Sequence, residues 1–187
     1  MKNFKSLFFT ILIIYSQLSF SASKAEIDAE IDEALQKLYE FSPAAKTLSE
    51  KAEGILVFPS IVKAGWIIGG SYGEGGLLIK NNINQYYNNI SGSLGFQFGI
   101  EKRSEIIMFL NKKTLTEFQN SNGWDGGVDG SVAITTFGVG MDLTVENIKD
   151  PIVSFVFSPT GLMVNVSLKG TKISEIDTLK WIRCSLW

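Results

Sequence analysis

The chain contains no histidine and only one cysteine, Cys184, in 187 residues. Without histidine there is no Ser-His or Cys-His nucleophilic pair, and the commonest neutral metal ligand is missing. A single cysteine excludes an internal disulfide, so Cys184 is either a small apolar filler or a site of intermolecular bridging. Because 45% of the residues are hydrophobic and only four are proline, the chain can bury one substantial core, and one domain is expected.

Positive charge is also scarce. The formal net charge is −2, and the excess of acidic groups lies near the N-terminus of the expected mature chain. Such a balance leaves no electrostatic footprint for nucleic acid.

The N-terminus has the pattern of a secretory signal peptide. Two lysines precede an apolar run from Leu7 to Tyr15, and small residues follow at Ser21–Ser23, where a signal peptidase could cut. The run is about half of the roughly 20 residues that a membrane-spanning helix needs. The sequence therefore predicts removal of residues 1–23 and export of a single domain, 24–187, to the periplasm or cell envelope.

Two consecutive helices are predicted at the start of the mature chain. Apolar residues recur at helical spacing from Glu26 to Phe41, with acidic residues in the first turn. Ser42 is a suitable N-cap for a second helix, with Pro43 at its first position and Gly54 closing it in a left-handed conformation.

Beyond Gly54 the apolar period changes to two, which indicates strands. A capping-box pattern predicts one short helix near 114–120 within the strand region. The many internal glycines favour strong curvature. We therefore expect an α+β fold in which a helical hairpin packs on a strongly curved, mostly antiparallel, glycine-rich sheet or small barrel. The strands are predicted at Ile55–Phe58, Gly65–Tyr72, Gly75–Lys80, Gln85–Ile90, Ser93–Ile100, Ile106–Leu110, Ser131–Leu143, Ile152–Phe157 and Leu162–Leu168.

Motifs for catalysis or metal binding are weak. Trp124–Gly130 lacks the ligands and closing glutamate of an EF-hand loop, and Gly69–Gly76 does not fit a phosphate-binding loop. Tyr72–Gly76 is instead interpreted as a tight turn between strands. A glycosidase needs only two facing carboxylates, so a carboxylate-dependent hydrolase remains an alternative. The carboxylates available for it are Glu74, Asp125, Asp129 and Asp142.

Several motifs, in a shared order over roughly residues 45–170, resemble the SYLF domain family, a family of lipid-binding modules. They are Ala52–Pro59, Lys63–Trp66, Tyr72–Gly75, Ile106–Leu110 before Asn111, Gly127–Ser131, and Gly161–Leu162 with Ser167–Gly170. The resemblance implies phospholipid binding, with phosphoinositide recognition in eukaryotic members and actin association in fungal ones. Eukaryotic members begin with a basic helix where this chain has an acidic one, and a signal peptide would keep the protein from cytoplasmic actin. Neither phosphoinositide preference nor actin binding is therefore carried over.

The leading hypothesis is an exported, non-enzymatic protein that binds phospholipid or another amphiphile, without cofactor, metal or catalytic residues. Basic groups would neutralise a headgroup, and aromatic rings would contact the apolar part of the lipid. The predicted lipid-binding residues are Lys63, Trp66, Tyr72, Phe96, Phe98, Lys102 and Arg103. The alternative is a structural envelope protein that binds a protein partner through the same sheet or its edge.

Overall fold

The structure is a computed structural model. It describes residues 23–65, 68–94, 99–121, 124–126, 134–137, 148, 150–159, 161–163 and 170–177. Its helices are α2 (Lys24–Phe41), α3 (Pro43–Ser49) and α4 (Lys112–Asn120). Its strands are β1 (Gly54–Gly65), β2 (Ile68–Ile79), β3 (Asn82–Leu94), β4 (Gly99–Phe109), β5 (Trp124–Gly126), β6 (Ile134–Phe137), β7 (Ile152–Ser158), β8 (Gly161–Leu162) and β9 (Thr171–Glu175).

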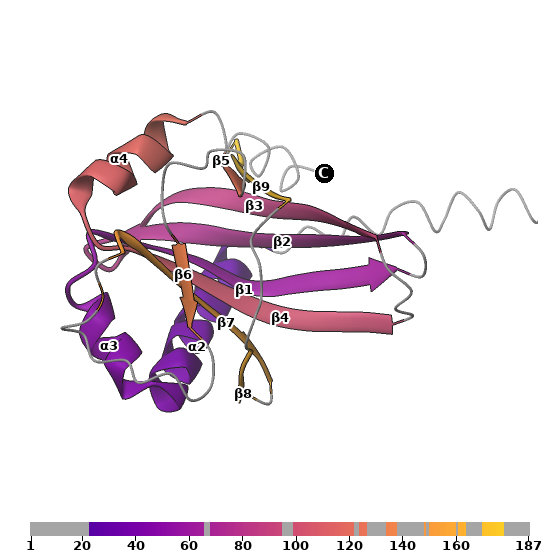
Figure 1. The fold of residues 1–187 in the computed structure, drawn as a ribbon, viewed down its shortest axis with the longest axis horizontal. Helices are drawn as coiled ribbons and strands as arrows, with labels where there is room; N and C mark the ends of the chain where they lie inside the picture. Colours follow the sequence, from indigo (N-terminus) through magenta and orange to yellow (C-terminus); the bar gives the residue numbers. More distant parts are fainter. Residues whose placement is uncertain are drawn as a thin grey trace, which may run out of the picture.

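The described strands form one open sheet in the order β5-β9-β3-β2-β1-β4-β7-β6, with β8 paired to β7 (Figure 1). All neighbours pair antiparallel except β6 and β7, which are parallel. The α+β prediction is confirmed, and the sheet takes the open rather than the closed form. The predicted strand 131–143 lies outside the described residues except for β6.

The two predicted helices are present, but α2 begins at Lys24, two residues before the predicted start at Glu26. The Ser23 side chain accepts a hydrogen bond from the Glu26 amide at the start of α2, and Ser42 caps α3 through the Ala45 amide. The end of α3 differs from the prediction, because Gly54 begins β1 and does not close the helix. A Cβ on Gly54 would lie 2.8 Å from Leu115 Cδ1, so glycine here allows α4 to pack closely.

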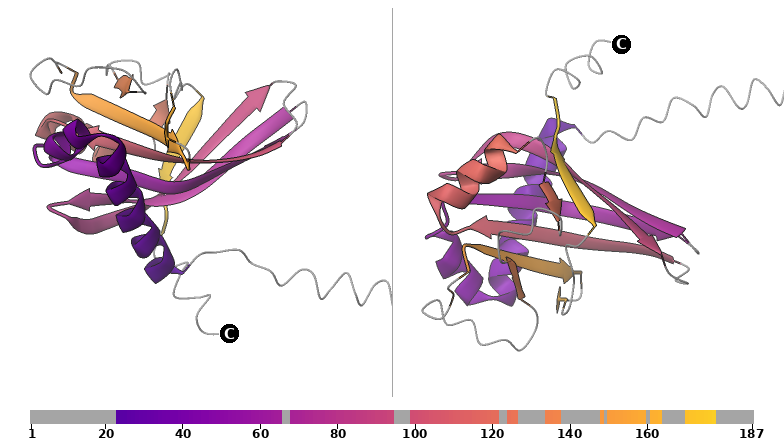
Figure 2. Two further views of the ribbon diagram at one scale, coloured as in Figure 1. Left: turned by 90° about the horizontal axis from the view of Figure 1, so that it is seen from below. Right: turned by 45° about the horizontal axis from the view of Figure 1, so that its top comes forward.

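The sheet is covered differently on its two faces, and each face carries its own core. On the helix face, which α2 and α3 cover, Val57, Ile106 and Phe155 pack with Ile31 and Leu38 of α2. On the α4 face, alternate residues of the same strands pack against that short helix and the β5–β9 pair. Both cores lie at one end of the long strands, and Figure 2 shows β1 to β4 extending well beyond the helices.

The long strands bend at one place. A β-bulge at 58–60 of β1 inserts one residue against both β2 and β4. Opposite the bulge, β2 carries Gly73 and Gly75; a Cβ on Gly75 would lie 2.0 Å from the Val57 carbonyl oxygen. The two glycines thus allow β2 to approach β1 more closely than any side chain would permit.

This bend also explains an error in the predicted strands. Residues 72–76 are not a turn: β2 is continuous through them, and the glycines serve curvature. The predicted strand Ser93–Ile100 is not one strand, because its first two residues end β3, which is continuous from Asn82 to Leu94, and its last two begin β4. A turn with positive φ at Lys80 and Asn81 joins β2 to β3.

The bend gives a stability prediction. We expect Gly75→Ala to lower the free energy of unfolding by about 3 kcal/mol, because the new methyl group would overlap backbone atoms that cannot move cheaply. Gly92→Ala is the matched control, since nothing lies within 4 Å of its Cβ position and it is also in a long strand. Urea denaturation of both variants checks this; equal midpoints would contradict the role given to Gly75.

Candidate functional site

Of the seven predicted lipid-binding residues, Trp66, Phe96 and Phe98 lie outside the described residues. The other four lie in the distal half of the sheet, which we define as residues 61–65, 68–73, 89–94 and 99–105. Lys63 is in β1, Tyr72 in β2, and Lys102 and Arg103 in β4. These four come from three adjacent strands, as a shared site would require.

The pleat divides these four residues between the two faces of the sheet. Val62 is the direct partner of both Tyr72 and Lys102, so these three side chains share the helix face. Lys63 and Arg103 are one residue away in their strands and therefore lie on the α4 face. The prediction that Lys63, Lys102 and Arg103 act together on one headgroup is therefore not supported by their placement.

A row of exposed apolar side chains crosses the distal half on the helix face. Val62, Tyr72 and Ile90 are directly opposite one another on β1, β2 and β3. They are 43%, 49% and 47% exposed, whereas most large apolar side chains of the described core are nearly inaccessible. Ile100, one row further out on β4, is 82% exposed. We call Val62, Tyr72 and Ile90 the apolar row.

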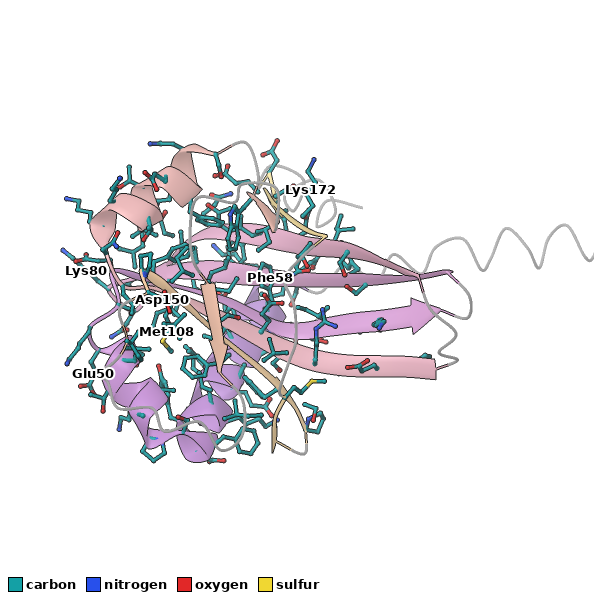
Figure 3. The ribbon with its side chains drawn as sticks, viewed as in Figure 1. Glu50, Phe58, Lys80, Met108, Asp150 and Lys172 are labelled. Atoms are coloured by element: carbon teal, nitrogen blue, oxygen red, sulfur yellow. The ribbon has the colours of Figure 1, made fainter. Side chains whose placement is uncertain are left out.

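A lysine lies at each end of the apolar row. Lys102 of β4 pairs with Val62, and Lys172 of β9 pairs with Ile90. Both lysines are exposed. Four strand spacings separate them, or about 19 Å at the usual distance between strands. Figure 3 shows Lys172 at β9 and Glu50, at the end of α3, on opposite sides of the fold.

Polar residues separate the apolar row from the core beneath the helices. Glu74 and Asn88 are opposite each other in the next row, with Ser60 beside them on β1. The Tyr72 hydroxyl donates a hydrogen bond to Glu74 Oε1 at 2.6 Å. Partial burial of this hydroxyl and the carboxylate raise the pKa of Tyr72 above its ordinary value, so the phenol stays protonated. Its ring therefore remains exposed while its polar end faces the protein.

The α4 face of the same region is polar and buried. Asn89 and Glu105 are inaccessible to solvent, and Asn89 Nδ2 donates to Glu105 Oε2 at 3.3 Å. These residues belong to β3 and β4, which β2 and β1 separate. Side chains can meet across two intervening strands only where the sheet curls toward them, so the α4 face is concave here.

Several buried polar atoms of this face have no hydrogen-bond partner among the described residues. They are Asn89 Oδ1, Glu105 Oε1, Arg103 Nε and Ser154 Oγ. Burial raises the pKa of Glu105 to about 7, against the opposing effects of the Arg103 charge and the Asn89 hydrogen bond. The carboxyl group is therefore half protonated near neutral pH.

The distal half thus departs from the usual distribution of polar and apolar residues, although Ile61 is buried there in the ordinary way. A soluble sheet normally buries apolar side chains and exposes polar ones. Here Glu105 and Asn89 are buried, whereas Val62, Tyr72 and Ile90 face outward. An exposed apolar strip with cationic ends is a surface suited to binding, because isolated monomers rarely leave such strips uncovered.

The described part of the chain holds no group of three or more histidine, cysteine, aspartate or glutamate residues that could bind a metal ion. None of its helices has both the length and the apolar composition needed to cross a bilayer. Of the carboxylates considered for hydrolysis, Glu74 is engaged by Tyr72, while Asp129 and Asp142 lie outside the described residues.

Residues 90–179 match the family described as Ysc84, Las17-binding protein actin regulator, which is the SYLF family. This match confirms, for residues 90–179, the SYLF resemblance found in the sequence. SYLF domains generally bind other molecules rather than catalyse reactions. The matched residues include β4, β7 and β9, and therefore both lysines of the candidate site. No curated protein matches the chain.

Sequence reasoning missed three residues of this site, Val62, Ile90 and Lys172. They come from β1, β3 and β9, and only the strand register brings them together. Glu105 was also missed, although a carboxylate directly before the apolar run Ile106–Leu110 was a usable signal of a buried charge.

The buried carboxyl group gives a second prediction. Because its folded pKa is about 7 and its ordinary value is 4.5, the folded state binds the proton more tightly. Stability should fall as pH rises from about 4.5 to about 7, and then level off. The full effect of this shift is on the order of 3 kcal/mol.

We expect Glu105→Gln to remove most of this slope, since the amide is neutral at every pH. Urea midpoints from pH 5 to pH 8 measure it, with Glu101→Gln on the same face of β4 as control. A variant whose slope equals that of the native protein would rule out Glu105 as the cause.

Proposed function

We propose that this SYLF protein is an exported, non-enzymatic protein of the cell envelope that binds phospholipid membrane surfaces through the helix face of its distal half. The observation that carries the proposal is the apolar row of Val62, Tyr72 and Ile90 between Lys102 and Lys172. The signal-peptide pattern of residues 1–23 supports export.

The chemistry of the row favours a lipid surface. Aliphatic side chains and an aromatic ring gain free energy when they enter the boundary between headgroups and acyl chains. The ring of Tyr72 is suited to this position, because its hydroxyl is already satisfied by Glu74. Lysines at both ends would contact lipid phosphates, each contributing about 1 kcal/mol at an anionic surface.

Helix α2 is less suited to membrane contact than the distal half. The N-terminal helix α2 has an acidic exposed face, and its apolar residues Ile27, Ile31 and Leu38 are buried against the sheet. It therefore has no apolar side to offer a membrane, which leaves the distal half as the contact. Binding to a protein partner through the same row is the alternative. Actin association, which the family description names, is not assigned here because of the predicted export.

The apolar row gives a direct test. We expect the double variant Val62→Ser/Ile90→Ser to bind vesicles about 30-fold more weakly, since two partly inserted side chains contribute roughly 2 kcal/mol. Co-sedimentation with vesicles of mixed zwitterionic and anionic phospholipid measures this. Both residues are exposed, so the melting temperature should change little. Unchanged vesicle binding by the folded variant would remove the row from the site.

The lysines give a separate test of the electrostatic part. We expect Lys102→Glu/Lys172→Glu to weaken binding to anionic vesicles about tenfold or more at low salt, and less at high salt. Lys46→Glu/Lys51→Glu is the matched control, because it changes the charge equally at exposed positions of the helical hairpin region. Equal losses in the two double variants would show that net charge, not this site, governs binding.

A further inference from the structure

A pocket lies directly beside one end of the apolar row, between α2 and strands β4 and β7. Its volume is about 160 Å³. Its charged lining residues are Glu30, Glu33 and Lys37 of α2 and Lys102 and Arg103 of β4. Lys102 therefore belongs both to this pocket and to the end of the apolar row, through its pairing with Val62.

The two walls differ in charge, because α2 carries Glu30 beside the Glu33–Lys37 ion pair, whereas β4 carries Lys102. On α2, Lys37 Nζ and Glu33 Oε1 form an ion pair at 2.6 Å. The hydrogen bond from Lys37 holds the pKa of Glu33 below its usual value, and the charge of Lys102 contributes a smaller part. Lys102 thus faces the acidic wall from across the pocket. Glu30 and Lys102 themselves have no ion-pair partner among the described residues.

A guest that satisfies both walls must carry one anionic and one cationic group. The anionic group would meet Lys102, at the boundary with the apolar row, and the cationic group would meet Glu30 on the helix. A primary ammonium donates hydrogen bonds to carboxylates, whereas a quaternary ammonium has no N–H to donate and favours aromatic faces. The floor of the pocket includes Pro59 and Phe157, and Phe157 is itself only 1% exposed.

We propose that this pocket receives the phosphoethanolamine headgroup of a phospholipid whose apolar part contacts Val62 and Tyr72, with the phosphate at Lys102 and the ammonium at Glu30. This inference rests on the proposed function, because the apolar row supplies the adjoining lipid contact. It adds a headgroup preference that the row and its two lysines alone do not give. The two lysines alone would favour anionic lipids whether or not the headgroup carries an amine.

Vesicles of one size and three compositions test the headgroup preference. They contain phosphatidylcholine alone, or phosphatidylcholine with equal fractions of phosphatidylethanolamine or phosphatidylglycerol. We expect the ethanolamine vesicles to bind about fivefold more tightly than phosphatidylcholine alone, the size of effect that one partly exposed charge contact gives. Glu30→Gln should abolish this difference. Glu40→Gln, on an exposed position of the same helix, should preserve it.

The possible failures can be told apart. If vesicles bind through the apolar row but show no ethanolamine preference, or keep it in Glu30→Gln, the pocket assignment is wrong and the proposed function stands. If no vesicle binds, both are overturned. Titration of the labelled protein with soluble phosphoethanolamine, followed by NMR, adds a further arm. If soluble phosphoethanolamine binds saturably but no vesicle binds, the bound group does not come from a phospholipid, and the proposal is wrong.

Discussion

The close approach of β2 to β1 at Gly73 and Gly75 is the constraint on which the rest of the structure depends. Opposite these glycines β1 accommodates an extra residue, and the sheet curls toward its α4 face. The curl lets Asn89 reach Glu105 across two strands. It also separates the long strands into a half that the helices cover and a half that extends beyond them (Figures 1 and 2).

The two halves differ in the side chains that they bury and expose. Under the helices the sheet has apolar residues on both faces, and each face has its own core. In the distal half the concave face buries a carboxyl group and an amide, at a cost that pairing between them only partly offsets. The same strands leave Val62, Tyr72 and Ile90 outside. Contact with a membrane would remove these exposed apolar side chains from water. The pocket beside Lys102 would make this contact depend on the lipid headgroup.

The sequence predicts those features that depend on neighbouring residues. Ser42 before Pro43 marks the start of α3, and Asn81 marks a turn, because caps and turns are local chemistry. Glycine at 73 and 75 was ambiguous, since the same residues suit a turn or a curved strand. The candidate site could not be predicted in full, because Lys172 and Lys102 are 70 residues apart and meet one surface only through a five-strand register. Tyr72 and Lys102 were found. Alternation within β4 already places Arg103 on the face opposite to Lys102, whereas the face of Lys63 depends on the bulge in β1.

The bulge in β1 determines which face of the sheet each later residue of that strand occupies. Each strand residue changes face with every step, so the one inserted residue decides which set of side chains points outward from Ile61 to Gly65. Loss of a single residue between Phe58 and Ile61 would turn Val62 inward and Lys63 outward while leaving the composition almost the same. Substitutions in this segment are therefore far easier to accommodate over evolution than changes in its length.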